Sequence, residues 1–119
     1  MPQRELKLYL WDIRRAGEDI LHFTKGKELV DYLQDPMLCA AVERKFEIIG
    51  EALSQAERLY PELRGLIDDS RQIIAFRNRV IHGYASLENR LVWSIVQVYL
   101  QPLLKQVETL LADINRLQR

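Results

Sequence analysis

The densest group of chemically useful side chains in this 119-residue sequence lies within residues 77–84. Arg77 supplies a fixed positive charge and a planar fork of hydrogen-bond donors. His82 can give and take a proton near neutral pH, and Tyr84 places a hydroxyl group directly after a glycine. Together these residues favour chemistry on a phosphate ester over chemistry on a small neutral molecule.

Transesterification of RNA is the reaction that these groups fit. A general base removes the proton of a 2′-hydroxyl group, and a general acid protonates the leaving 5′-oxygen atom. His82 can perform the proton transfer, and Arg77 can stabilise the charged phosphorane. The reaction needs neither a metal nor another cofactor, and its expected product carries a 2′,3′-cyclic phosphate.

A purely structural interpretation of the same residues is also open. A histidine in the last turn of a helix, followed by glycine, is a common and favourable helix end. Arg77 can be a solvated charge, and Tyr84 an anchor on the core. Within a continuous helix, Arg77 and His82 lie about 140° apart around the axis. They would therefore converge only at an irregular helix end or across a symmetry axis with a second copy.

Helices must position this stretch, because only 5 Gly and 4 Pro are available for turns. Gly26 suits a left-handed helix end, and Asp35 before Pro36 is a strong start signal. Residues 61–66 are predicted to be a connector with at most one helical turn. The predicted helices span roughly 4–23, 28–33, 36–59, from a cap at Asp68, Asp69 or Ser70 to Ile81 or His82, and 87–117 after a cap at Ser86.

Apolar residues at three- and four-residue steps define the predicted core faces of the two long N-terminal helices. Glu43, Glu47 and Glu51 form an acidic stripe on another face of the second. That stripe is either a solvated face helped by Arg44 and Lys45, or it faces a basic group of this chain or a partner. The predicted core residues are Leu6, Leu10, Ile13, Gly17 and Ile20 in the first helix, and Leu38, Val42, Phe46, Ile49, Leu53 and Ala56 in the other.

The last helix carries no charge between Arg90 and Lys105. A helix that is apolar nearly all round is buried on more than one side, which in a small domain favours a second subunit. The run is too short to cross a bilayer. Pro102 is predicted to bend this helix, since it lacks a backbone donor and clashes with the carbonyl group four residues back.

Composition predicts one soluble domain over residues 1–119, with 48% apolar and 29% charged residues. The formal net charge of zero excludes a strongly basic nucleic-acid coat protein, so any RNA contact requires a local basic cleft. Cys39 is the only cysteine and is predicted to be a buried, reduced thiol. One cysteine and an N-terminus without a signal-peptide core fit a cytoplasmic protein.

Residues 77–84, with the pattern Arg-x4-His-x-Tyr, resemble the signature of HepT-like ribonuclease toxins of the HEPN superfamily. The resemblance extends to residues 92–96 (Val-Trp-Ser-Ile-Val), which a proline follows later in the same helix. It also includes residues 46–52 (Phe-Glu-Ile-Ile-Gly-Glu-Ala) and the N-terminal helix. It therefore covers nearly the whole chain, with no departure at the motif positions.

The resemblance implies an antiparallel HEPN bundle of four to five helices, forming a homodimer whose two motifs line a shared cleft. Arg77 and His82 would catalyse metal-independent cleavage of RNA, supported by Asn78 and Arg79. Tyr84 would be the residue to which a cognate nucleotidyltransferase antitoxin attaches AMP, silencing the toxin. The alternative class of function is a non-catalytic HEPN module that binds a nucleotide or a nucleotidyltransferase partner.

Overall fold

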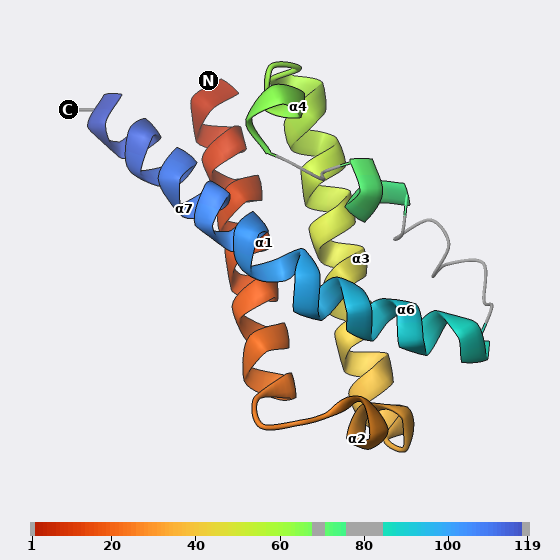
Figure 1. Ribbon diagram of the computed structural model, residues 1–119. Coiled ribbons are helices and arrows are strands. Elements are labelled where there is room, and N and C mark those ends of the chain that lie inside the picture. Colours follow the sequence, from red (N-terminus) through yellow and green to blue (C-terminus); the bar gives the residue numbers. More distant parts are fainter. Residues whose placement is uncertain (1, 68–70, 76–84, 118–119) are drawn as a thin grey trace.

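The computed structural model describes residues 2–67, 71–75 and 85–117, and all the regular secondary structure in these ranges is helical. The helices form an all-α bundle, which confirms the predicted fold class (Figure 1). Residues 71–75 form a further helical segment. Within the described ranges, no helix is long and apolar enough to cross a membrane. The named helices are α1 (Pro2–Thr24), α2 (Leu29–Leu33), α3 (Pro36–Leu59), α4 (Leu63–Leu66), α6 (Ala85–Val98) and α7 (Leu100–Leu117).

The two long helices α1 and α3 lie side by side in opposite directions, joined at one end by α2 (Figure 1). Gly26 has a φ of 74°, the left-handed conformation predicted after the first helix. The Asp35 carboxylate accepts a hydrogen bond from the backbone N–H of Leu38 at 3.0 Å, with Pro36 as the first helical residue. Both boundary predictions are confirmed.

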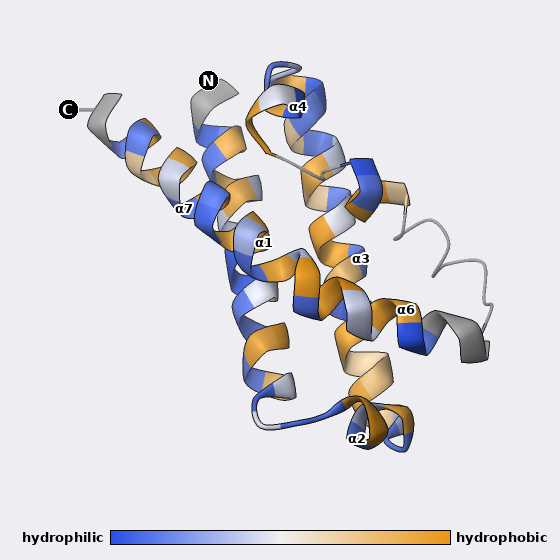
Figure 2. Cartoon of the chain, in the orientation of Figure 1, coloured by the Kyte–Doolittle hydropathy of each residue, from blue (hydrophilic) through white to orange (hydrophobic). Residues whose placement is uncertain are grey.

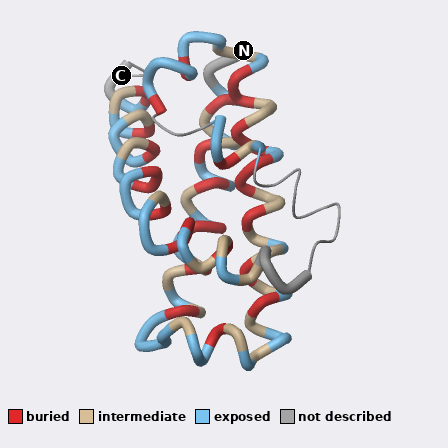
Figure 3. Tube along the Cα trace, turned by 45° about the vertical axis from the view of Figure 1, so that its right-hand side comes forward, coloured by how far each residue is buried: buried red, intermediate tan, exposed pale blue. Residues whose placement is uncertain are grey.

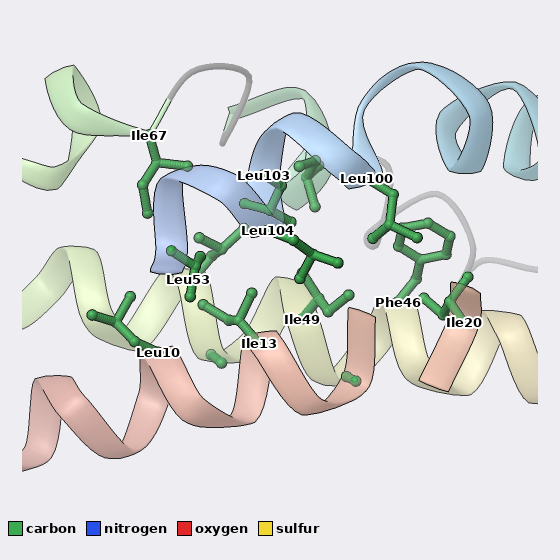
Figure 4. Packing of buried hydrophobic residues seen from close by; sticks show 14 of the residues in the cluster. Leu10, Ile13, Ile20, Phe46, Ile49, Leu53, Ile67, Leu100, Leu103 and Leu104 are labelled. Atoms are coloured by element: carbon green, nitrogen blue, oxygen red, sulfur yellow. The ribbon is translucent and has the colours of Figure 1, made fainter. Parts of the chain in front are cut away.

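One hydrophobic core joins α1, α3 and α7 (Figure 4). Their apolar residues lie on the inward faces, whereas exposed and hydrophilic residues lie on the outward faces (Figures 2 and 3). Burying each large aliphatic or aromatic side chain contributes about 1.5–3 kcal/mol. The predicted core faces are confirmed, except that Leu38 is only partly buried. Fully buried members include Leu10, Ile13, Ile20, Val42, Phe46, Ile49, Leu53, Leu100 and Leu103.

At Gly17, α7 packs closely against α1. A β-carbon placed on Gly17 would lie 2.5 Å from Cδ2 of Leu104, 3.1 Å from its Cγ and 3.2 Å from its Cδ1. Leu104 itself is 7% exposed, so its side chain fills the space over the glycine. The absence of a side chain at residue 17 therefore lets α7 pack directly on α1.

The prediction of a single helix over 87–117 is wrong, because α6 and α7 are separate helices with a break at Tyr99. Pro102 has no N–H to offer the carbonyl group of Val98, four residues back. The flanking bonds survive, from the Tyr99 N–H to the Ile95 carbonyl group (2.9 Å) and from the Leu103 N–H to the Tyr99 carbonyl group (3.1 Å). Pro102 therefore disturbs the helix as predicted, but the result is a break between two helices and not a bend within one.

The start of the last helix was also predicted too late. α6 begins at Ala85, so Ser86 lies inside its first turn and does not precede the helix as a cap. The helical turn predicted between residues 61 and 66 is confirmed as α4.

The acidic stripe on α3 is partly neutralised by neighbouring side chains. Arg44 pairs with Glu47 at 3.2 Å, as the solvated-face interpretation expects. Glu51 accepts a hydrogen bond from Gln55 at 3.0 Å. Lys45 instead pairs with Asp19 at 2.9 Å and so ties α3 to α1. The solvated-face interpretation therefore holds for Arg44 and is wrong for Lys45.

Candidate functional site

All five predicted site residues lie in the segment 76–84, outside the described residues: Arg77, Asn78, Arg79, His82 and Tyr84. The predicted caps at Asp68, Asp69 and Ser70, and the predicted helix end near His82, lie outside the described residues as well. The structure does describe the chain on both sides of the motif segment. Helical residues 71–75 precede it, and α6 follows it.

Covalent geometry limits how far the site residues can be from these helices. A chain spans at most about 3.6 Å per residue. The α-carbon of Arg77 is therefore within about 7 Å of that of Ala75, and the α-carbon of His82 within about 11 Å of that of Ala85. In the sequence, the two predicted catalytic residues are thus closely flanked by the described residues 71–75 and the start of α6.

A cleft of about 420 Å³ lies against residues 71–75, on the side of the bundle where α3 ends. It is formed by the last turns of α3, by α4 and by the 71–75 segment. In Figure 1 these three segments gather at the same end of the molecule, away from α2. The lining residues are Ser54, Glu57, Arg58, Arg64, Arg71, Ile74 and Ala75.

Among the described residues that line the cleft, three are arginines and one is a glutamate, so this part of the lining is basic. Glu57 is only 6% exposed, and its carboxylate pairs with Arg64 at an N–O distance of 3.7 Å. Arg58 and Arg71 are exposed. Within the part of the chain that the structure describes, neither of them forms an ion pair. In a chain of zero net charge, such a local group of arginines is the kind of feature expected from the sequence for RNA contact.

Residues 92–96, which carry part of the sequence resemblance, hold α6 in place. The Trp93 ring packs on the Tyr32 ring of α2, with centroids 5.3 Å apart and planes inclined by 38°. Val92, Ile95 and Val96 are buried in the core. These residues therefore position the helix that directly follows Tyr84.

Cys39 of α3 and Tyr32 of α2 are buried side chains that each carry a titratable group. Burial raises the pKa of the Cys39 thiol and is also the main reason that the pKa of the Tyr32 hydroxyl group is well above its usual range. The Cys39 thiol donates a hydrogen bond to the Tyr32 carbonyl oxygen at 3.2 Å. The predicted burial of Cys39 is thus confirmed. Over the described ranges, no three His, Cys, Asp or Glu side chains are grouped to hold a metal ion.

Comparison with known proteins identifies the family. The model of the family described as "Ribonuclease HepT-like" matches residues 13–110, which is most of the chain and includes the motif segment. The chain belongs to this family. It is a HepT-like chain of the HEPN superfamily, and membership places it among the ribonucleases.

Individual relatives support the same assignment. The chain is 35% identical over 99 residues to a "Probable ribonuclease HepT" of Thermococcus cleftensis, covering 80% of this chain and 86% of the relative. It is 31% identical over 108 residues to a "Putative RNase" of Methanocaldococcus jannaschii, covering 91% and 98%. A second such protein from the same organism is 28% identical over 119 residues, covering 97% and 94%. No solved structure matches the chain at a significant level.

The arginines of the cleft were not predicted from the sequence. Arg58, Arg64 and Arg71 are six and seven residues apart, and they belong to three different segments. A six-residue step turns by about 240° around a helix and does not return to the same face, so helical periodicity does not group all three. They come together because α4 and residues 71–75 both lie beside the end of α3.

Proposed function

We propose that this HepT-like chain is a metal-independent endoribonuclease that acts as the toxin of a toxin–antitoxin pair in the cytoplasm. One observation carries the proposal: Arg77 and His82 are both present, at the Arg-x4-His spacing, inside the stretch that matches the ribonuclease family. A module that only bound a nucleotide would not need both residues. The HepT-like domain is taken to span residues 1–119.

In the proposed reaction the 2′-hydroxyl oxygen attacks the adjacent phosphorus atom. A general base takes the 2′-hydroxyl proton, and the 5′-oxygen atom leaves with a proton from a general acid. His82 performs proton transfer, and the Arg77 guanidinium group stabilises the negative charge that develops on the phosphorane. Asn78 and Arg79 support the site as polar and cationic neighbours. The products are a 2′,3′-cyclic phosphate and a free 5′-hydroxyl group.

The proposal includes a homodimer and a regulatory partner. A second copy would bring a second motif segment to a shared cleft, so that Arg77 and His82 of two chains could act together. A cognate nucleotidyltransferase antitoxin would attach AMP to the Tyr84 hydroxyl group. The adduct would place bulk and negative charge where the phosphate of the substrate must lie, which silences the toxin.

Cleavage of RNA in the presence of a chelator tests this function. The wild-type chain should cut single-stranded RNA and leave 2′,3′-cyclic phosphate ends, and the His82→Ala variant should not. Equal cleavage by both proteins would refute the assignment of His82. No cleavage by either would favour the non-catalytic module that binds a nucleotide or a nucleotidyltransferase.

A further inference from the structure

The cleft lined by Arg58, Arg64 and Arg71 suits an anionic ligand. Arginine is the side chain best matched to phosphate, because its rigid fork of N–H donors can form two parallel hydrogen bonds. The buried Glu57 carboxylate offsets one of the three charges through its ion pair with Arg64. Arg58 and Arg71 are exposed and form no ion pair within the described residues, so their full charge is available to a ligand.

The rest of the lining favours a polynucleotide backbone over a free small anion. The cleft has a volume of about 420 Å³, much more than one inorganic anion fills. Ser54 adds a hydroxyl group, and Ile74 and Ala75 add apolar surface against which a sugar or base can lie. Contacts of these kinds, from arginine and serine to phosphate and from apolar groups to the nucleoside, are typical of nucleic-acid interfaces.

The cleft is also next to the proposed catalytic segment. Ala75 lines it, and the α-carbon of Arg77 is within about 7 Å of that of Ala75 because of chain connectivity. An RNA strand a few nucleotides long could therefore contact both Arg77 and the cleft.

We propose that the cleft between α3, α4 and residues 71–75 binds a backbone phosphodiester of the RNA strand, close to the one that is cleaved. This inference rests on the proposed ribonuclease function for the identity of the strand. Arg58 and Arg71 contact the phosphate, and Arg64 is a positioning residue whose ion pair keeps the Glu57 carboxylate away from it.

Binding measurements in a His82→Ala background test the proposal without cleavage. The probe is a fluorescein-labelled single-stranded RNA of ten nucleotides, followed by fluorescence anisotropy in EDTA over a series of salt concentrations. Arg58→Ala and Arg71→Ala should each weaken binding by roughly threefold to tenfold, as expected for a charge-assisted contact at an exposed site. The slope of log K against log salt concentration should become shallower by about 0.7 for each lost phosphate contact.

Arg15→Ala is the matched control, since it removes the same charge from an exposed position on α1 that does not line the cleft. It should leave affinity and salt dependence within twofold of the parent protein. Arg64 is not substituted, because its removal would leave the buried Glu57 carboxylate without its ion pair to Arg64. Circular dichroism should show unchanged helicity for Arg58→Ala and Arg71→Ala, which change exposed side chains.

Cleavage assays on the same substitutions in the wild-type background separate the two proposals. Loss of a contact that is remote from the reacting atoms should raise KM and leave kcat nearly unchanged. If the wild type cleaves RNA while Arg58→Ala and Arg71→Ala bind and cleave normally, the cleft assignment alone fails. If binding depends on these arginines but the wild type cleaves nothing, the ribonuclease proposal alone fails. The cleft assignment would also fail if Arg15→Ala weakened RNA binding as much as the cleft variants do. It would fail too if Arg58→Ala and Arg71→Ala weakened the binding of labelled ATP but not of RNA.

Discussion

His82 and Arg77 have separable roles in the proposed reaction, and each can be tested by truncation. His82→Ala removes the proton-transfer group, which typically costs about 10²–10⁴-fold in rate. Arg77→Ala removes one positioned charge and should cost roughly 10²–10³-fold. Both effects should appear in single-turnover cleavage of a labelled RNA and as lost toxicity on expression.

Circular dichroism and thermal melting of both variants distinguish this catalytic role from a structural one. If His82 merely finishes a helix favourably, His82→Ala should lose helicity or stability in proportion to any loss of activity. Folded variants that remain toxic would exclude both residues from catalysis.

Tyr84 is the residue at which regulation is proposed. An attached AMP carries one negative charge, which Arg77 and Arg79 would attract through charge-assisted hydrogen bonds of about 1.5–3 kcal/mol each. Tyr84→Phe keeps the ring and removes only the acceptor oxygen. This variant should stay folded, keep much of its cleavage activity and escape silencing by modification. Intact-mass analysis after incubation with the nucleotidyltransferase partner and ATP checks this outcome.

The mass gain of the wild type serves as the reference in that experiment. An equal gain on Tyr84→Phe would place the modification on another residue and remove Tyr84 from the regulatory role.

At the scale of the helices, local signals in the sequence placed two boundaries correctly but misplaced the start of α6 at Ser86. Asp35 before Pro36 and the left-handed Gly26 fixed two boundaries correctly, because a cap and a glycine conformation depend on their immediate neighbours. The break at Tyr99 was not predicted, although a bend caused by Pro102 was. Whether a proline bends or interrupts a helix depends on how the two halves pack, here α6 near α2 and α7 on α1.

The partners of charged residues were the least predictable feature of the elements. Lys45 was assigned to the acidic stripe of its own helix, yet it pairs with Asp19 of α1. The basic cleft was missed for the same reason, since Arg58, Arg64 and Arg71 meet only through tertiary folding. The catalytic assignment, in contrast, came from a compact motif, and it remains a prediction because residues 76–84 lie outside the described ranges.

The contact between α1 and α7 provides a test of packing at Gly17. Gly17→Ala would gain about 1 kcal/mol of helix propensity, but its β-carbon would lie 2.5 Å from Cδ2 of Leu104. Overpacking of this kind typically costs 1–3 kcal/mol, so we expect net destabilisation in urea unfolding.

A double-mutant cycle identifies the cause. Leu104→Ala alone should cost roughly 2–5 kcal/mol through the cavity that it leaves. The space left by Leu104 can accept the new methyl group, so the double variant should be more stable than the sum of the single effects predicts. Strict additivity would show that Gly17 and Leu104 do not limit the approach of the two helices.

The whole molecule is a thin slab, with extents of 48 × 28 × 20 Å. Its shortest extent is about two helix diameters, so few helices are covered on all sides. The uncharged run between Arg90 and Lys105 extends to the exposed positions of α6 and the start of α7. These positions are Ser94, Gln97, Val98, Gln101 and Pro102. An exposed helix face without charge is characteristic of the centre of a protein interface, where charged residues are depleted.

This uncharged face is where we expect the two copies of the proposed homodimer to meet. Light scattering of the wild type at micromolar concentration should give twice the mass of one chain. Val98, which is 59% exposed, is the apolar residue of the face, and Val98→Arg should shift the equilibrium to the monomer by burying an unpaired charge. Val30→Arg is the matched control, since Val30 is 53% exposed on α2 and should tolerate the charge. A monomeric wild type would refute the shared catalytic cleft. A Val98→Arg dimer of unchanged affinity would move the interface to another face and leave the dimer itself in place.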